Sequence, residues 1–206
     1  MSLDVPAVAP RERARPLPPD DRRAALIACV IPLLKEHGRD VSTRQIADAC
    51  GVAEGTVFRA FGDKESLITA AIETYFDPLP FRTALRGIDP ELPVEQKLGA
   101  VLGLLRDRFA GVIGFMTALR MSDGPPPAVR TGGQEWLEVL RDLLSPNATE
   151  LAVPVETVGA YLRLVAMAAA VPQFNASHEF GTDDLLALVA HGVLASGRDG
   201  ACSAGS

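Results

Sequence analysis

The 206-residue sequence has few aromatic residues and no long hydrophobic run. Aromatic side chains make up 5% of it, with a single Trp. No apolar stretch approaches the roughly 18–20 residues that a helix needs to cross a bilayer, which argues against a membrane-spanning protein. The Pro- and Arg-rich leader, residues 1–19, lacks the apolar core of a secretory signal, and we expect it to be disordered. These features predict a soluble, cytoplasmic protein.

Cysteine is also scarce, and the three residues, Cys29, Cys50 and Cys202, are widely spaced. Their odd number and spacing indicate neither a disulfide framework nor a zinc site. Cys29 and Cys50 lie on apolar helix faces, so we interpret them as core residues. Nothing near them promises the exposed, low-pKa thiol of a redox sensor. The three histidines lack metal-ligand spacing, and we expect no metal and no cofactor.

An excess of positive charge is missing too, since the net charge is −6. The imbalance is uneven along the chain. Residues 11–76 hold ten Lys or Arg against ten Asp or Glu, whereas residues 77–206 hold ten against fifteen. The amino-terminal third is therefore the only part that does not repel an anionic partner on average, which permits nucleic-acid binding without diagnosing it.

Helical periodicity is present throughout, whereas no segment alternates cleanly as a strand would, so we predict an all-α fold. The first helix is expected to be capped by Asp20 or Asp21 and to end before Gly38, and Pro32 should kink it or shift its start. Ser42 and Gln45 fit a capping box, and Asp63 is placed to cap another helix. The expected helices span 20–37, 43–50, 54–61, 64–77, 93–109, 112–121, 134–145, 155–171 and 183–195.

Residues 43–67 carry the pattern of a helix-turn-helix. Two short helices that cross at a tight turn need a small residue at the crossing, a residue tolerant of positive φ, and a branched apolar residue beyond it. Ala47, Gly51 and Val57 meet these needs in order, and Ile46 and Val52 complete the expected packing. An ordinary helical hairpin can mimic this spacing, but here a helix precedes the pair and a capped helix follows it directly.

This segment resembles the DNA-binding head of the tetracycline-repressor (TetR) family over about residues 22–75. The matching features are the run GVAEGT at 51–56, the aromatic Phe58 and Phe61, and the sequence DKE at 63–65. The resemblance implies a three-helix helix-turn-helix head, placed at residues 20–76. It also implies a larger helical ligand-binding and dimerisation domain at 77–197, followed by a disordered tail at 198–206.

The second helix of such a motif enters the major groove, and its first turns meet base edges. Arg44 and Arg59 are expected to contact bases or phosphates, and Lys64 to hold phosphate. Glu54 is more easily explained as a helix-start acid than as a cytosine reader. The residues expected to meet DNA are Thr43, Arg44, Glu54, Gly55, Thr56, Phe58, Arg59 and Lys64.

Two positions depart from the family pattern, which usually has tyrosine where Phe58 stands and commonly histidine where Ala60 stands. Phe58 keeps the ring but lacks the hydroxyl that would bond a phosphate, so base or sugar contact and plain packing are equally open for it. DNA binding is then expected to depend more on Arg44, Arg59 and the leader. Arginines 11, 13 and 15 there are either a DNA-binding arm or a disordered solubiliser.

The body offers bulky apolar side chains that could line an effector pocket, although plain core packing is the default for each. The helices at 155–171 and 183–195 are more apolar than a surface pair should be, and the resemblance implies that they form a four-helix dimer seam. The weak candidates for ligand contact are Phe109, Phe115, Met116, Trp136, Tyr161 and Met167.

No nucleophile elbow, phosphate loop or paired catalytic motif is present in the sequence, so we do not expect an enzyme. We interpret the chain as a homodimeric one-component transcriptional regulator. The expected mode is a repressor that binds a palindromic operator and is released by a mostly apolar small molecule. The alternative is a helical binding protein for an apolar small molecule whose head no longer reads a specific operator.

Overall fold

The computed structural model describes residues 18–122, 124–125, 135–174 and 180–194. The leader arginines, most of the Pro-rich segment after residue 123 and the tail lie outside these residues. Every named element in the described part of the chain is helical, and the one β-type pairing is an isolated bridge between Leu151 and Leu194. The predicted all-α fold is confirmed.

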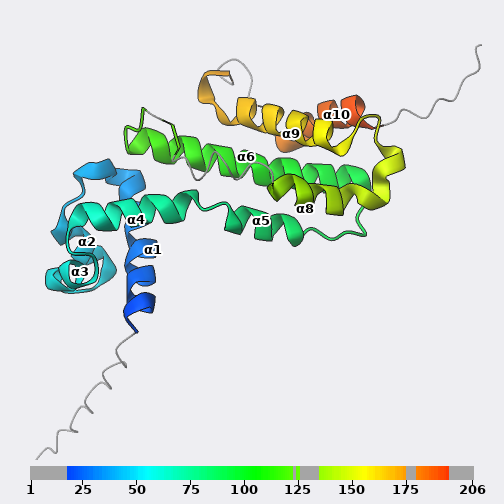
Figure 1. Ribbon diagram of the computed structural model, residues 1–206. Helices are drawn as coiled ribbons and strands as arrows, with labels where there is room; N and C mark the ends of the chain where they lie inside the picture. Colours follow the sequence, from blue (N-terminus) through cyan, green and yellow to red (C-terminus); the bar gives the residue numbers. More distant parts are fainter. Residues whose placement is uncertain (1–17, 123, 126–134, 175–179, 195–206) are drawn as a thin grey trace, which may run out of the picture.

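The head occupies one end of the molecule, where α1 stands roughly across the other helices (Figure 1). Its four α-helices are close to those expected from the sequence. They are α1 (Pro19–His37), α2 (Thr43–Cys50), α3 (Glu54–Phe61) and α4 (Lys64–Phe76), with a 3-10 turn, η1 (Gly38–Asp40), after α1.

The start of α1 differs from the expectation, because its N-cap is a proline without a side-chain hydrogen bond. Asp20 and Asp21 lie in the first turn instead, where negative charge is favoured by the helix dipole. Pro32 lies inside α1, which continues through it. Proline has no N–H, so the Ala28 carbonyl lacks the hydrogen bond that residue 32 would otherwise donate. Ala28 and Pro32 are both exposed, so water can satisfy that carbonyl.

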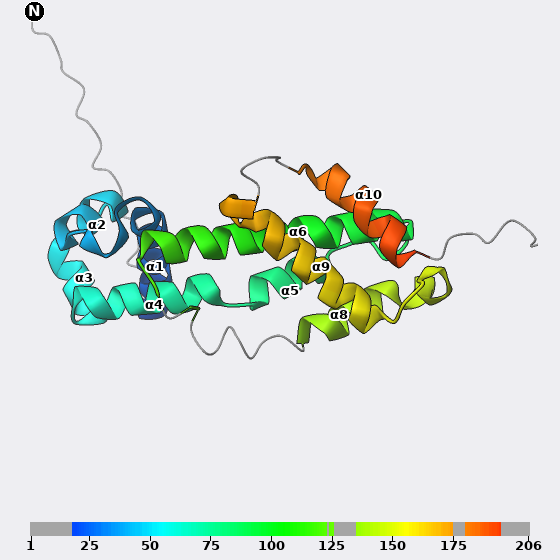
Figure 2. The same cartoon turned by 90° about the horizontal axis from the view of Figure 1, so that it is seen from above.

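The body consists of helices packed along one long central helix, α6. Viewed from above, α9 crosses over α6, and α10 also packs on α6 (Figure 2). Its elements are α5 (Leu79–Arg86), α6 (Val94–Ala118), α8 (Glu135–Leu144), η2 (Ser145–Glu150), α9 (Val155–Ala170), η3 (Pro172–Phe174) and α10 (Thr182–Val193).

Two expectations for the body were wrong. No helix was predicted between residues 77 and 93, where α5 lies. Pro78 is the N-cap of α5 and Pro80 lies in its first turn, positions at which proline is tolerated. The expected break between residues 109 and 112 does not exist, since α6 runs through Gly111. A side chain at Gly111 would place its Cβ 2.8 Å from the Tyr75 hydroxyl, so this glycine permits α4 and α6 to approach closely.

The buried apolar residues form two clusters, and α6 contributes to both. The body cluster lies between α5, α6, α8, α9 and α10. The head cluster includes Phe115 and Leu119 at the end of α6. The Phe115 ring lies 4.0 Å from that of Tyr75 and 5.9 Å from that of Phe76, measured between centroids. The end of α6 is therefore part of the core of the head.

A partly buried polar contact joins the same two helices. The guanidinium of Arg108 on α6 donates hydrogen bonds to the backbone carbonyls of Tyr75 (2.9 Å), Phe76 (2.6 Å) and Asp77 (3.2 Å). These carbonyls are at the C-terminus of α4, where they have no intrahelical partner. Burial lowers the pKa of Arg108, and the nearby Tyr75 and Asp77 partly oppose that effect.

None of the helices in the described ranges combines the length and hydrophobicity of a membrane-spanning segment.

Candidate nucleic-acid interface

The helix-turn-helix is built from local caps that match the predictions. The Gln45 backbone N–H donates to Ser42 Oγ (3.2 Å), and the Ser42 N–H donates to Gln45 Oε1 (2.8 Å), which completes the capping box at the start of α2. Gly51 ends the helix in the left-handed conformation (φ 64°, ψ 32°). The Asp63 carboxylate accepts from the Ser66 N–H (2.7 Å) and starts α4.

Packing beneath these caps fixes how α3 is presented. Ile46, Ala47 and Val57 are buried at the crossing of α2 and α3, as predicted, and Phe61 is buried at the end of α3. Since these apolar side chains face inward, the opposite face of α3 lies at the outer end of the head (Figure 1). The geometry is that of a second helix free to enter a DNA groove.

Of the residues expected to meet DNA, five lie on α3 at positions that are exposed or half-buried, whereas Thr43 and Arg44 belong to α2 and Lys64 to α4. Thr43, Thr56 and Lys64 are half-buried. No atom lies within 4 Å of a Cβ placed on Gly55, so another backbone can approach there. The exposed members of the set are Arg44, Glu54, Gly55, Phe58 and Arg59.

The basic side chains of this set make only weak contacts in the free protein. Arg44 pairs with Asp48 at 3.9 Å across one helical turn, with both side chains highly exposed. Arg59 Nε donates to the Gly55 carbonyl at 3.4 Å, and Lys64 Nζ donates to the Arg39 carbonyl at 3.2 Å. Exposed pairs of this kind contribute about 0–1 kcal/mol, so exchanging them for phosphate contacts costs little.

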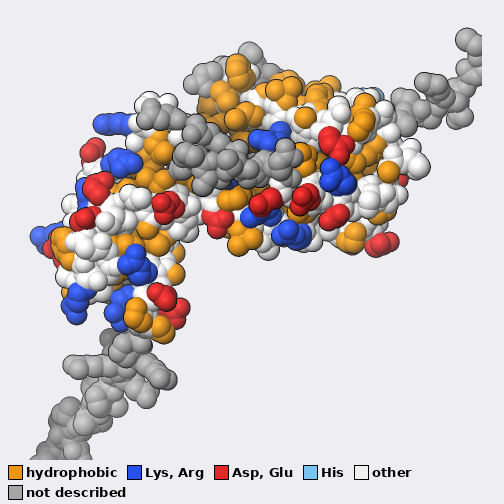
Figure 3. All heavy atoms as spheres, viewed as in Figure 1, with side chains coloured by type: hydrophobic (Ala, Val, Ile, Leu, Met, Phe, Trp, Pro, Cys, Tyr) orange, Lys and Arg blue, Asp and Glu red, His pale blue; other side chains and the backbone are white. Residues whose placement is uncertain are grey.

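Sequence reasoning missed a basic groove between α1 and α3. The groove has a volume of about 520 Å³ and adjoins the outer face of the recognition helix. Arg23 donates a hydrogen bond to the Ala60 carbonyl, and its guanidinium lies 4.3 Å from the centre of the Phe61 ring. Lys and Arg side chains gather on this end of the head (Figure 3). The lining residues are Pro19, Arg22, Arg23, Thr56, Arg59 and Ala60.

The only signal in the sequence for this groove is the Arg22-Arg23 pair at the start of the first helix. Periodicity alone does not indicate which of the two adjacent arginines faces α3, because that depends on how α1 packs on α3. Arg22 is half-buried and Arg23 is exposed. The groove adds α1 to the set of elements that can contact a phosphate backbone.

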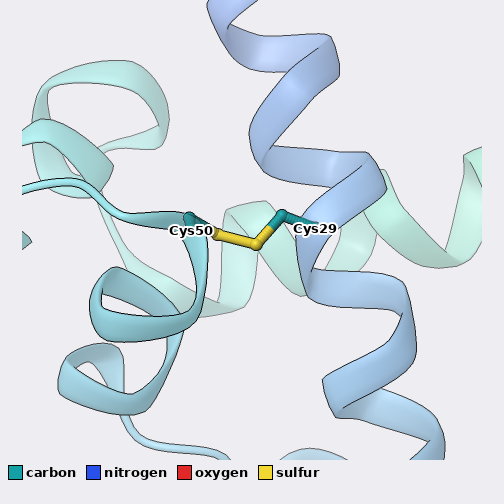
Figure 4. The surroundings of a disulfide bond; sticks show 2 residues. All are labelled: Cys29 and Cys50. Carbon is teal, nitrogen blue, oxygen red and sulfur yellow. A yellow bond between two sulfur atoms is a disulfide. The ribbon is translucent and has the colours of Figure 1, made fainter.

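The head also contains a covalent link that contradicts the sequence analysis. Cys29 on α1 and Cys50 at the end of α2 form a disulfide, with their Cα atoms 5.7 Å apart (Figure 4). The interpretation of the two residues as unlinked core thiols was therefore wrong. The pairing was missed because 21 residues separate the cysteines and only the crossing of two helices brings them together.

The six residues suggested for ligand contact are not brought together. Phe115 and Met116 belong to the head cluster, whereas Phe109 and Trp136 belong to the body cluster. Tyr161 and Met167 on α9 are 36% and 45% exposed, and the Tyr161 ring lies beside Gly192 of α10.

A groove of about 480 Å³ on the body contains none of the six. It lies between the start of α6 and α10, and its lining is Glu95, Asp183, Leu186, Ala187, Ala190, His191 and Leu194. Within the described part of the chain, no three His, Cys, Asp or Glu side chains cluster as metal ligands would.

Residues 31–71 match the family described as bacterial regulatory proteins, tetR family. A sequence comparison with curated proteins gives no match.

Solved structures similar to the chain include a TetR transcriptional regulator from Streptomyces coelicolor, with 26% identity and a TM-score of 0.53. The similarity covers 84% of this chain and 98% of that one. A transcriptional regulator from Rhodococcus sp. RHA1 has 21% identity and a TM-score of 0.54, covering 83% and 97% of the two chains. The likeness therefore extends over both the head and the body.

Proposed function

We propose that this chain, which belongs to the TetR family of bacterial regulatory proteins, represses transcription as a homodimer bound to palindromic operator DNA and leaves the DNA when a small molecule binds. The observation that carries the proposal is the capped helix-turn-helix, whose second helix has its inner face buried and its outer face free. DNA binding by such a head is the common function of the motif.

In the proposed complex, α3 lies in the major groove. The exposed Gly55 lets the backbone come close to DNA, and Thr56 contacts a phosphate or a thymine methyl group. Arg44 and Arg59 supply base or phosphate contacts from the two helices of the motif. The basic groove beside α3 is proposed to seat the phosphate backbone that flanks the major groove.

The homodimer is proposed to form through α9 and α10. Both helices expose large apolar side chains: Leu164 is 67% exposed, Met167 45% and Leu188 60%. Hydrophobic side chains gather over the top of these helices (Figure 3). A contiguous apolar surface of this kind favours a protein partner. A second copy fits, because a two-fold axis sets the same surface of each subunit against the other.

Release of DNA is proposed to work through the junction of α4 and α6. Because Arg108 and Phe115 hold the end of α4, a ligand that shifts α6 also shifts the recognition helix packed on α4. In a dimer, a small change in each head alters the spacing of the two recognition helices relative to half-sites about one helical turn apart. The effector pocket and its lining, including the six candidate residues, remain a prediction.

The test is selection of bound sequences from a random DNA pool, using the full chain and its Arg44→Ala and Thr56→Ala variants. We expect an enriched palindrome with the parent protein and its loss in both variants. The matched control is Arg86→Ala, which removes an exposed arginine on α5 and should leave enrichment unchanged. Affinity should fall steeply with salt, because phosphate contacts release counterions.

Phe58 favours a second candidate function, that of a small-molecule binding protein without operator recognition. Its ring is 46% exposed on α3 and lacks the hydroxyl of the tyrosine usual in the family. The same selection separates the two functions. Salt-sensitive binding without an enriched sequence would show that the head contacts the phosphate backbone but does not recognise particular bases. Absence of binding at low salt would favour the small-molecule binding protein.

A further inference from the structure

The disulfide between Cys29 and Cys50 joins α1 to the end of α2, next to the turn of the helix-turn-helix. Cys50 is the last residue of α2 and directly precedes Gly51, the turn of the helix-turn-helix. The Val52 N–H donates to the Ala47 carbonyl (3.0 Å) and closes that turn. Cys29 belongs to α1, so the bond fixes the end of α2 and its turn against a different helix (Figure 4).

Both cysteines are half-buried, so part of each residue reaches the solvent from which a small thiol reagent would approach. Val30 and Leu34 of α1 and Ile46 of α2 are fully buried by apolar packing beside the bond. We therefore expect a head with two free thiols to keep its fold. The bond adds a constraint to a structure that is already assembled.

We propose that Cys29 and Cys50 are a reversible oxidation site, and that their oxidation stabilises the head and tightens its binding to DNA. The DNA part of this inference rests on the proposed function. A transcriptional regulator works beside the chromosome, where thiol buffers keep most cysteines reduced. Disulfides in that setting are usually transient or redox-sensing rather than permanent links.

The chemistry is thiol–disulfide exchange with a glutathione-type thiol. In the reducing direction, a thiolate attacks one sulfur of the pair, forms a mixed disulfide and releases the other cysteine, which takes up a proton. A second thiol attacks the small-molecule sulfur and releases the remaining cysteine. Two thiols are oxidised to one small disulfide while the protein disulfide gains two electrons and two protons. Oxidised glutathione drives the reverse reaction.

The effect on DNA binding follows from the turn that the bond restrains. The orientation of α3 relative to α2 depends on residues 51–53, and the bond limits how far the end of α2 can move from α1. A recognition helix held in place before binding loses less conformational entropy on DNA. The oxidised head is therefore expected to bind more tightly than the reduced head.

The experiment uses the full chain with Cys202→Ser, which removes the third thiol and prevents disulfides through it. The protein is equilibrated in glutathione buffers of graded redox ratio, alkylated, and analysed by mass spectrometry. We expect two alkylated thiols under reducing conditions and none under oxidising conditions, with full reversal. The melting temperature of the oxidised form should be higher by roughly 5–10 °C, since a cross-link restricts the unfolded chain.

DNA affinity is measured in both redox states on a duplex chosen from the random pool, at one salt concentration. We expect about three- to tenfold tighter binding by the oxidised form. Cys29→Ser and Cys50→Ser, each in the Cys202→Ser background, serve as controls and should match the reduced parent in either buffer. The reduced parent itself gives the comparison if either variant fails to fold.

Alkylation of both cysteines in oxidising buffer would overturn the oxidation site, and equal melting temperatures of the two forms would overturn its stabilising effect. Equal DNA affinity of the two forms would overturn its coupling to DNA. Failure of both forms to bind any DNA at low salt refutes the proposed function and the coupling together. In that case, alkylation and melting still decide whether the pair is a reversible oxidation site that stabilises the head.

Discussion

Removing the guanidinium of Arg108 should weaken the attachment of the head to the body. Arg108→Met keeps most of the aliphatic stem but deletes three hydrogen bonds to the backbone carbonyls at the end of α4. A hydrogen bond from a charged donor contributes about 1.5–3 kcal/mol when its partner is left unsatisfied. The three are not additive, and the site is half-buried, so we expect a loss of about 2–4 kcal/mol in the free energy of unfolding.

The assay is thermal and urea unfolding at one fixed protomer concentration, because a dimer's stability depends on concentration. A loss of this size lowers the melting temperature by roughly 4–16 °C in a chain of about 200 residues. Arg108→Lys should fall between the parent and Arg108→Met, since one ammonium group cannot reach all three carbonyls. The control is Arg86→Met, an exposed arginine expected to change stability by less than about 0.5 kcal/mol.

A result for Arg108→Met within about 0.5 kcal/mol of that control would refute the reasoning. It would mean that water replaces the guanidinium at the three carbonyls without loss. The end of α4 would then be held by apolar packing alone.

The remaining predictions concern the cap of α4, the DNA face and the dimer face. The Ser66 backbone N–H donates to the Asp63 carboxylate and lowers the pKa of that carboxyl below its ordinary value. The ionised carboxylate therefore stabilises the fold at neutral pH, and this contribution is lost as the pH falls below about 4. In urea titrations, Asp63→Asn should lose less stability than the parent between about pH 5 and 3. Phe58→Tyr should tighten operator binding by about fivefold in a gel-shift titration, through one added phosphate hydrogen bond, and unchanged affinity would exclude that contact. Leu164→Glu should raise the dimer dissociation constant at least about tenfold in sedimentation experiments. The control is Leu79→Glu on α5, where the leucine is 51% exposed, and it should leave the dissociation constant unchanged. A stable Leu164→Glu dimer would place the interface elsewhere.

The sequence was most informative where a structure is decided within a few residues. The capping box of Ser42 and Gln45, the left-handed Gly51 and the Asp63 cap were all predicted correctly, because each depends on a side chain and a backbone group three or four positions apart. The predicted bounds of α3 agree with those observed, Glu54 and Phe61, since turns flank it on both sides.

Features that depend on tertiary packing were missed. Gly111 lies in the gap predicted between two helices, but in the structure it belongs to one continuous helix and permits the close approach of Tyr75. The disulfide of Cys29 and Cys50 and the groove beside Arg22 both arise where α1 crosses the helix-turn-helix. No periodicity along a single helix specifies such a crossing.

Because the end of α6 is part of the core of the head, that core is completed only after α6 has been synthesised. Phe115 and Leu119 are fully or almost fully buried in that core, yet they are translated after the rest of it, which ends at Phe76. At about 5–20 residues per second, the ribosome needs roughly 2–9 s to add the 43 residues from Phe76 to Leu119. During that time α4 can pack on α1 and α3, but Tyr75 and Phe76 at its end lack their contact with Phe115 and can be bound by a chaperone. A fragment that stops at Phe76 would remain in this incomplete state permanently.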